Sequence, residues 1–415
     1  MRFPLISAAF ALALCDAATA DPLVLHRGVA VHEWLNWAPL AADGSYIWPP
    51  YRSIAQWLAV DRPATDWAPG DQFARIRKLG FDFVRLSVDP GPLLASDGAR
   101  RQQALDRLHD DVKMITAAGL KVVFNLQAVS QVAAYSMDVV NAGSSSPEIA
   151  HYQQMAADVA RMLLTIGADK VAIEPFNEPS YYPCTTNDHG DWQKVMAATV
   201  NAIRAVSHEM TIVATGACGG DVIGLVDLDA RTFDDPDILY SFHMYDPHKF
   251  THQRLDDPKM FGSGLPWPPS ADTPEGVVDA LKARMDLAGV DPAAQATNLE
   301  VVKPLIDAYF NDNFDEAALD GEFTAAVDWA KANGIPSQRL FIGEFGVILM
   351  SDDGRTGAAD ADRLRYLTDV RTEAEKHGIP WSIWEYSNPY GMTVIVPKGP
   401  ADPDPELLKA IGLTQ

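Results

Sequence analysis

The stretch Val171-Ala-Ile-Glu-Pro-Phe-Asn-Glu-Pro179 begins as a short apolar, partly β-branched run and ends in polar residues and prolines. Such a run, bounded by proline, is typical of a buried strand, so residues 171–177 are predicted to form one. Residues 148–166, just before it, read as a helix. A helix leading into a buried strand is the repeating element of a parallel sheet, which needs a crossover helix between its strands.

The same alternation recurs along the chain. Gly80, Gly119, Gly334 and Gly378 each stand just before a predicted strand, where glycine ends a helix by adopting a left-handed conformation. The predicted strands are 24–31, 81–88, 121–127, 171–177, 211–217, 238–245, 339–345 and 381–386. The predicted helices include 71–79, 101–118, 148–166, 192–209, 322–333 and 359–377. Eight strands with intervening helices predict an α/β fold, a single (β/α)8 TIM barrel.

Two long segments interrupt this rhythm, residues 38–68 after the first strand and residues 246–320 after the sixth. Both follow the carboxyl ends of strands, where barrels of this kind place their active sites, so we expect insertions that form cleft walls. The alternative is that these segments are only loops on the protein surface. With neither a repeat nor a linker to divide the chain, residues 21–415 are expected to form one catalytic domain.

The first twenty residues have the pattern of a secretory signal peptide. One arginine precedes an apolar run that is too short to span a bilayer, and the segment ends in Ala18-Thr19-Ala20. Cys15 raises the alternative of a lipoprotein, but Leu14 stands where such signals need a small residue. Cleavage after residue 20 and a secreted or periplasmic location are therefore expected.

The net charge of −23 excludes partners that need a basic surface, so neither nucleic acid nor an anionic membrane is expected to bind. A monomer is expected. Cys184 and Cys218 remain after cleavage, and an oxidising compartment favours a disulfide between them, which the sequence leaves open.

Two glutamates follow strands that face each other across an eight-stranded barrel. Glu178 follows the fourth predicted strand, and Glu344 lies at the end of the seventh in Arg339-Leu-Phe-Ile-Gly-Glu-Phe-Gly346. A bulge or turn at a strand exit can aim consecutive polar residues into the barrel mouth. Glycoside hydrolysis needs two carboxyl groups flanking one bond, one protonated and one ionised. A structural salt bridge is the alternative for either glutamate alone.

With these motifs the chain resembles glycoside hydrolase family 5, the cellulase-type retaining glycosidases, over nearly the whole barrel. The positions that match the family's motifs are Arg85, Asn177, Glu178, His243, Tyr245, Glu344 and Trp384. The resemblance implies that Glu178 is the acid/base and Glu344 the nucleophile.

The other matching residues are implied to support these two. By resemblance, Arg85 supports Glu344, Asn177 binds the sugar 2-hydroxyl, and His243 and Tyr245 line the pocket. Trp384 is implied to form a platform under the sugar, since an indole face suits the apolar face of a pyranose. Alternatively, Arg85 neutralises Glu174, and both roles can hold together. Structural roles are also open for His243 and Trp384.

The chain departs from the family at two strand exits. Gln127 stands where the family usually has histidine after the third strand, and an amide can bind a hydroxyl but cannot carry a proton. The segment His32-Glu33-Trp34-Leu-Asn36-Trp37 is more polar than the family's usual turn, and Trp34 is expected to contact substrate.

His252, in the segment that opens the 246–320 insertion, is also expected to contact substrate. His243, His248 and His252 raise the alternative of a metal site, but they lack an accompanying carboxylate pattern, so neither a metal nor a cofactor is expected.

The function predicted from these features is retaining hydrolysis of a β-linked polysaccharide or oligosaccharide, with a β-glucan such as cellulose favoured. Mannan, xyloglucan and exopolysaccharide remain alternative substrates. A barrel that binds or assembles carbohydrate without turnover is the alternative of a different class, motivated by Gln127.

Overall fold

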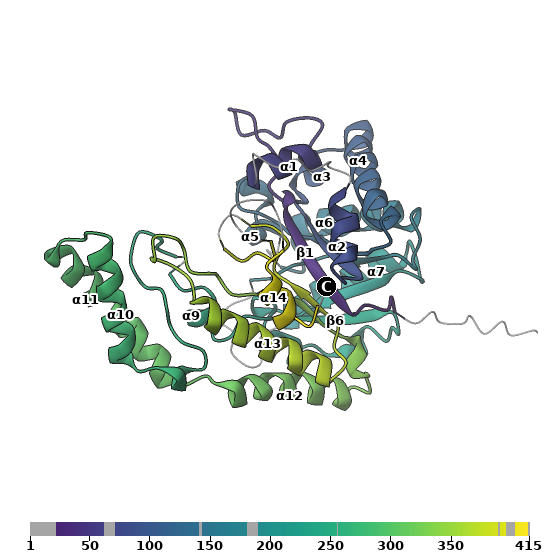
Figure 1. Ribbon diagram of the computed structural model, residues 1–415. Coiled ribbons are helices and arrows are strands. Elements are labelled where there is room, and N and C mark those ends of the chain that lie inside the picture. Colours follow the sequence, from purple (N-terminus) through teal and green to yellow (C-terminus); the bar gives the residue numbers. More distant parts are fainter. Residues whose placement is uncertain are drawn as a thin grey trace, which may run out of the picture.

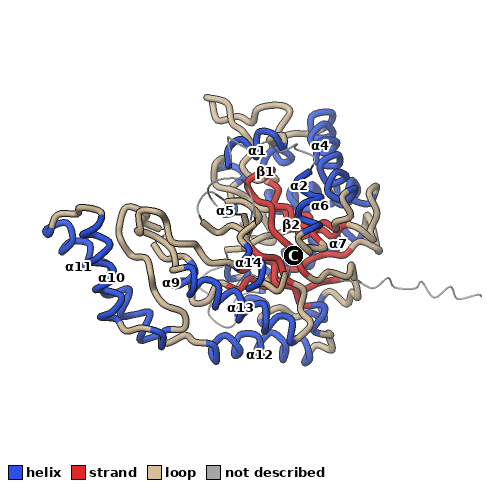
Figure 2. Tube along the Cα trace, viewed as in Figure 1, coloured by secondary structure: helices blue, strands red, loops and turns tan. Residues whose placement is uncertain are grey.

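Eight parallel strands close into one barrel in the order of the sequence, with β1 paired to both β2 and β8. The computed structural model describes residues 22–61, 71–140, 143–180, 190–254, 256–388, 391–395 and 403–413. Figure 2 shows the strands gathered at the centre with helices around them. The strands are β1 (Arg27–Leu35), β2 (Phe83–Val88), β3 (Lys121–Leu126), β4 (Val171–Glu174), β5 (Thr211–Thr215), β6 (Ile238–Met244), β7 (Leu340–Phe345) and β8 (Trp381–Ile383). The predicted (β/α)8 barrel is confirmed.

Helices cover the outside of the barrel and pack their apolar faces onto the strands. The α-helices are α1 (Ile54–Asp61), α2 (Asp71–Lys78), α3 (Gly91–Leu94), α4 (Gly98–Ala117), α5 (Met137–Val140), α6 (Pro147–Leu164), α7 (Gly190–Arg204), α8 (Val222–Val226), α9 (His248–Thr251), α10 (Pro274–Leu287), α11 (Pro292–Asp312), α12 (Glu316–Ala332), α13 (Asp360–Lys376) and α14 (Pro405–Ala410). Short 3-10 helices are η1 (Ala133–Tyr135), η2 (Cys218–Gly220), η3 (Ala230–Thr232), η4 (Pro269–Ala271) and η5 (Ser337–Arg339). None of the described helices is both long and apolar enough to cross a membrane.

The predicted strands differ from the observed ones mainly at their exits. β4 ends at Glu174, three residues before the predicted end, because Pro175 has no N–H to continue the ladder. β8 likewise stops at Ile383. β1 instead runs on to Leu35, four residues past its predicted end, with a register shift against β2 between Val31 and Leu35.

The barrel interior is filled in layers. A buried apolar layer comprises Leu23, Leu25, Phe83, Val123, Ala172, Val213, Leu239 and Phe341. Because side chains alternate along a strand, the residues two positions further on also point inward. On five neighbouring strands these are polar and fully buried, namely Arg85, Asn125, Glu174, Thr215 and Ser241. Apolar packing therefore closes one part of the barrel, and the strand ends beyond it carry a polar floor.

The segment after β6 builds a lobe that stands out from the barrel. Its helices α10 and α11 lie side by side, and Figure 1 shows them projecting away from the strands. Asn298 on α11 ties the lobe to the preceding loop, since its side chain exchanges two hydrogen bonds of 2.8 Å with the backbone of Phe261. The sequence pattern indicated an insertion here but not these helices. The segment after β1 includes α1, and residues 62–70 of it lie outside the described part.

Candidate active site

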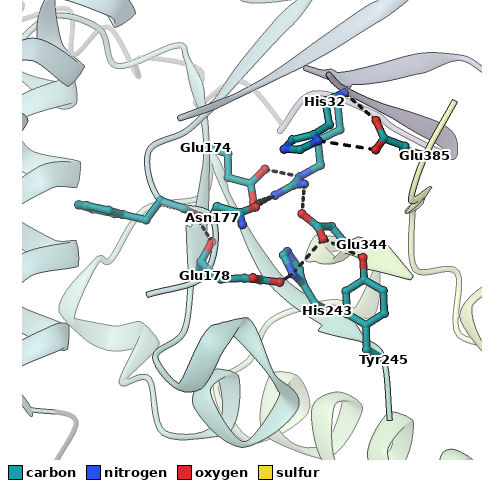
Figure 3. Close-up of polar contacts among 11 residues, drawn as sticks. His32, Glu174, Asn177, Glu178, His243, Tyr245, Glu344 and Glu385 are labelled. Atoms are coloured by element: carbon teal, nitrogen blue, oxygen red, sulfur yellow. Dashed lines mark hydrogen bonds and ion pairs between the residues drawn. The ribbon is translucent and has the colours of Figure 1, made fainter. Parts of the chain in front are cut away.

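Arg85 on β2 organises the polar side of the barrel. It has no exposed surface, and its guanidinium donates to both carboxylate oxygens of Glu174, at 2.7 and 2.9 Å. It also donates to Oε1 of Glu344 at 2.6 Å and to Oδ1 of Asn177 at 2.7 Å. Arg85 therefore contacts both Glu174 and Glu344, the two partners weighed for it from the sequence. One cation fixes two carboxylates and an amide that come from two strand exits (Figure 3).

A bulge in β7 turns Glu344 toward this cluster. Phe242 pairs with Ile342, but the next residue of β6, His243, pairs with Glu344, so Gly343 is an extra residue in β7. A Cβ atom on Gly343 would lie 2.8 Å from Nε2 of His243 and 2.8 Å from Oγ of Ser241, and only glycine fits there. Strict alternation would point Glu344 away from the interior once Phe341 points inward. The extra residue reverses that direction.

Glu178, His243 and Glu344 converge at the mouth of the barrel. Nδ1 of His243 lies 2.8 Å from Oε1 of Glu178 and 3.7 Å from Oε2 of Glu344. One side-chain donor atom from each of the three residues lies within 4.8 Å of the others, so the two carboxylates are close neighbours. The Glu178 side chain is 35% exposed and that of Glu344 is 5% exposed. Glu178 is thus the carboxylate that faces the cleft more openly.

The surroundings of Glu344 favour its ionised form. Burial alone would raise the pKa of this carboxyl group, but His243, Arg85 and the hydroxyl of Tyr245 hold the pKa below its ordinary value. Tyr245 donates to Oε2 of Glu344 at 2.8 Å, while Arg85 donates to Oε1. Burial also works against a charged His243, yet Glu344 and Glu178 raise the pKa of its imidazole. The cluster therefore pairs an ionised Glu344 with a histidine that retains a proton readily.

A row of aromatic rings extends from Tyr245 into the segment after β6. The ring of His252 lies edge-on to Tyr245, with centroids 4.9 Å apart, and stacks on His248 at 3.9 Å. Burial lowers the pKa of His252 to about 3, so this ring stays neutral across the usual working range. The ring of His252 thus packs against Tyr245, whose hydroxyl donates a hydrogen bond to Glu344. It also lines a cavity of about 450 Å³ whose other walls include Val302 and Ile306 of α11.

Trp384 and Gln127 follow β8 and β3, and both side chains are half-buried. Oε1 of Gln127 is buried and has no hydrogen-bond partner among the described residues. Trp384 lies with its ring centroid 4.7 Å from that of His32. Both side chains are partly open to solvent at the strand exits, and their contact with substrate stays a prediction.

Trp34 does not lie where the sequence predicted. It has no exposed surface, stacks on Trp57 with centroids 5.8 Å apart, and donates its indole N–H to the carbonyl of Arg52 at 2.9 Å. It packs in the core between β1 and the surrounding helices. The expectation that it contacts substrate is wrong, because the register shift between Val31 and Leu35 breaks the alternation that would have put Trp34 on the same side of β1 as His32.

A second buried group of titratable residues, not predicted from the sequence, lies beside Trp384. His32 and Glu33 lie at the end of β1, Glu385 follows β8, and donor atoms of the three lie within 4.8 Å of one another. Burial opposes the charge on His32, but Glu33 and Glu385 raise its pKa to about 9. The sequence signal was Glu385 directly after Trp384, together with the unusual His32-Glu33 pair.

Cys218 lies at the start of η2 and is disulfide-bonded. Cys184, the partner expected from the sequence, lies outside the described residues.

The geometry can be set beside known proteins. The family model for cellulase, glycosyl hydrolase family 5, matches residues 64–389. The chain belongs to glycosyl hydrolase family 5. It is therefore a glycoside hydrolase, and the enzyme class expected from the sequence is confirmed.

Individual relatives of this family 5 chain are distant. Endoglucanase 3 of Fibrobacter succinogenes is 27% identical over 202 residues, 48% of this chain but only 27% of that longer protein. Cellodextrinase A of Ruminococcus flavefaciens is 24% identical over 311 residues, 74% of each chain. The solved structure of endoglucanase Cel5A from Thermotoga maritima matches with a TM-score of 0.64 at 18% identity, covering 94% of this chain and 100% of that one. At this identity the likeness supports the barrel fold.

Proposed function

We propose that this family 5 chain hydrolyses a β-linked glucan with retention of configuration, using Glu344 as nucleophile and Glu178 as acid/base. The observation that carries the proposal is that one carboxylate oxygen of Glu178 lies within 4.8 Å of one of Glu344. Retaining glycosidases hold their two carboxyl groups about 5–5.5 Å apart, whereas inverting enzymes leave about 6.5–9.5 Å for a water molecule. The close pair favours direct attack by one carboxylate.

Glu344 suits the nucleophile because it is ionised and oriented. Each of its oxygens accepts one hydrogen bond, from Arg85 and from Tyr245, so the carboxylate cannot rotate freely. In the first step Oε of Glu344 attacks the anomeric carbon, and the bond from that carbon to the leaving oxygen breaks. The product of this step is a glycosyl ester on Glu344.

Glu178 suits the acid/base because its side chain is open to the cleft and paired with His243. In the first step it gives its proton to the leaving oxygen. In the second step it takes a proton from water, whose oxygen attacks the anomeric carbon while the bond from that carbon to Glu344 breaks, which releases the sugar and the free carboxylate. The contact of 2.8 Å between Nδ1 of His243 and Oε1 of Glu178 lets these two groups hold a proton between them. Asn177, fixed by Arg85 through its Oδ1, keeps its amide N–H groups as donors for a sugar hydroxyl.

A β-glucan is the favoured substrate because the relatives named above are an endoglucanase and a cellodextrinase. Cel5A of Thermotoga maritima was also solved with mannotriose, so mannan belongs among the alternatives beside xyloglucan and exopolysaccharide. A panel of these polysaccharides, with product lengths resolved by chromatography, separates the substrates. Binding without any reducing-sugar release on the whole panel would instead support a barrel without turnover.

Two glutamate variants test the catalytic roles on an aryl β-glucoside with a good leaving group. Glu178→Ala should form the glycosyl-enzyme but release it slowly, and azide should speed release and give a β-glycosyl azide. Glu344→Gln should fold and lose nearly all turnover, with no β-azide product. Glu275→Gln, an exposed carboxylate on α10, should behave as the wild type. Substantial turnover by Glu344→Gln, or no azide effect on Glu178→Ala, would contradict the assignment.

Export remains part of the proposal. Residues 1–20 lie outside the described part of the structure, and their signal-peptide pattern supports a cleaved leader. Amino-terminal sequencing of the mature protein tests it, since cleavage places Asp21 first.

A further inference from the structure

The exits of β1 and β8 bring together three metal-ligating side chains that the proposed reaction does not use. His32 is 8% exposed, and the side chains of Glu33 and Glu385 are 15% and 1% exposed. Figure 3 shows His32 and Glu385 facing each other near Glu344. The register shift between Val31 and Leu35 is what lets two consecutive residues, His32 and Glu33, reach one point.

The distances between the side-chain atoms of this group are too long for hydrogen bonds. Nδ1 of His32 lies 3.5 Å from Oε1 of Glu33 and 3.6 Å from Oε1 of Glu385, and it has no hydrogen-bond partner among the described residues. A contact of that length is not a hydrogen bond, and a buried nitrogen without a partner is costly. Ligands of a tetrahedral zinc ion stand roughly 3.3–3.6 Å apart, because each lies about 2.0–2.2 Å from the metal. The two separations from Nδ1 of His32 fall at that spacing, and the ligand atoms of all three residues lie within 4.8 Å of one another.

The donors are also held in place, as metal ligands usually are. Oε2 of Glu385 accepts the backbone N–H of His32 at 3.0 Å, and Oε1 accepts the side-chain amide of Asn388 at 2.7 Å. Hydrogen bonds of this kind orient a carboxylate before the metal arrives. In the described part of the chain, no lysine or arginine forms an ion pair with Glu33 or Glu385, so no side-chain ammonium or guanidinium neutralises them.

Two other groups of described residues have metal-like spacing, and both are otherwise explained. Glu178, His243 and Glu344 form the candidate active site. Asp320, Glu373 and His377 lie at half-exposed positions, and Nζ of Lys376 binds both Asp320 and Glu373 at 2.8 Å. Outside the candidate active site, the group at the β1 and β8 exits is the buried one among these described groups, and Nδ1 of its His32 has no hydrogen-bond partner.

We propose that His32, Glu33 and Glu385 bind a divalent transition metal ion, with Zn²⁺ the best fit. Two carboxylates balance the charge of the ion, and a mixed imidazole and carboxylate set suits zinc. Three protein ligands leave a fourth position for water or a sugar hydroxyl. The ion clamps the end of β1 to the end of β8 and steadies Trp384, whose ring lies 4.7 Å from that of His32. This inference does not depend on the proposed function.

Zinc binding by the full, chelator-treated protein tests the proposal. Isothermal titration and metal analysis after desalting should show one Zn²⁺ per chain, with a rise in Tm. Glu385→Gln and Glu33→Gln should each weaken binding by at least about tenfold. Glu178→Gln and Glu373→Gln, which alter the two other groups, should bind zinc like the wild type.

Three results would overturn the proposal. The first is that the wild type binds no zinc, in which case a protonated imidazole lies between the two carboxylates. The second is that Glu178→Gln or Glu373→Gln loses zinc binding, which would assign the ion to another group. The third is that Glu33→Gln binds zinc as tightly as the wild type, and this variant at a partly exposed position is sufficient for the test if Glu385→Gln fails to fold.

Discussion

The hydroxyl of Tyr245 lies 2.8 Å from Oε2 of Glu344, while Arg85 occupies the other oxygen of the same carboxylate. A phenol and a guanidinium from two different strand exits thus hold one acidic group. This arrangement fixes both the orientation of Glu344 and its charge, and it can be tested one contact at a time.

Tyr245→Phe removes one hydrogen bond to Glu344 without changing shape. A hydrogen bond to a charged group contributes about 1.5–3 kcal/mol, so kcat/KM should fall about 10- to 100-fold. The bond lowers the pKa of Glu344, and its loss raises that pKa, so the acid limb of the pH profile should move to higher pH. Tyr309→Phe, whose hydroxyl donates to the backbone of Pro266, should leave the profile in place. An unmoved acid limb in Tyr245→Phe would refute this account.

Arg85→Met should destabilise the protein strongly, because Glu174 has no exposed surface and would keep an unpaired buried charge. Breaking such a buried pair costs about 3–5 kcal/mol, measurable by urea unfolding. Adding Glu174→Gln removes the stranded charge and should recover part of the loss. Arg231→Met breaks an exposed pair with Asp229 and should not change Tm. Equal effects of the Arg85 and Arg231 variants would show that burial does not matter here.

Gly343→Ala should damage activity far more than stability. The new Cβ would lie 2.8 Å from Nε2 of His243, so the bulge must shift and carry Glu344 with it. A displacement of about 1 Å at a reacting group can cost about 100-fold in kcat. Gly321→Ala is the matched control, since its Cβ meets nothing within 4 Å inside α12, and it should stabilise by about 0.5–1 kcal/mol. Normal turnover in Gly343→Ala would mean that the bulge does not set the position of Glu344.

Asp89→Asn should stabilise the protein above pH 7 and give no gain near pH 4. Burial raises the pKa of Asp89 from 3.8 to about 7, despite its hydrogen bond from the backbone of Gly91. A raised pKa in the folded state means stability that is fully present below pH 3.8 and lost as pH rises to about 7. Asparagine does not titrate and avoids that loss, a gain on the order of 4 kcal/mol. Urea unfolding at pH 4 and pH 8 measures it, and a less stable variant at pH 8 would contradict the argument.

Residues near one another in the chain account for what sequence reasoning predicted correctly. Apolar runs such as 121–127, each after a helical segment and a glycine, were sufficient for the barrel. The carboxylates of Glu178 and Glu344 could be assigned to opposite strand exits from strand order alone, because an eight-stranded barrel places its fourth and seventh strands across one mouth.

Trp34 and the lobe of α10 and α11 show where such reasoning fails. Trp34 lies among polar residues at a strand exit, and only its side of β1 decided that it packs in the core. The helices of the lobe begin at local start signals, Thr273-Pro274 and Asp291-Pro292, which the prediction of an insertion over residues 246–320 did not use. The packing of α11 against α9 and the loop at Phe261 is a tertiary feature.

The sequence by itself determined the barrel, the two glutamates and the family, because strand period, helix ends and motif residues are all local features of the chain. Only the tertiary structure decided that Arg85 serves Glu174, Asn177 and Glu344 at once, and that a one-residue bulge at Gly343 turns Glu344 inward. It also brought His32 and Glu33 to Glu385, more than three hundred residues away. The register shifts in β1 and β7 that bring these side chains into contact arise when neighbouring strands pair. Strand pairing is a property of the closed barrel and not of any one segment.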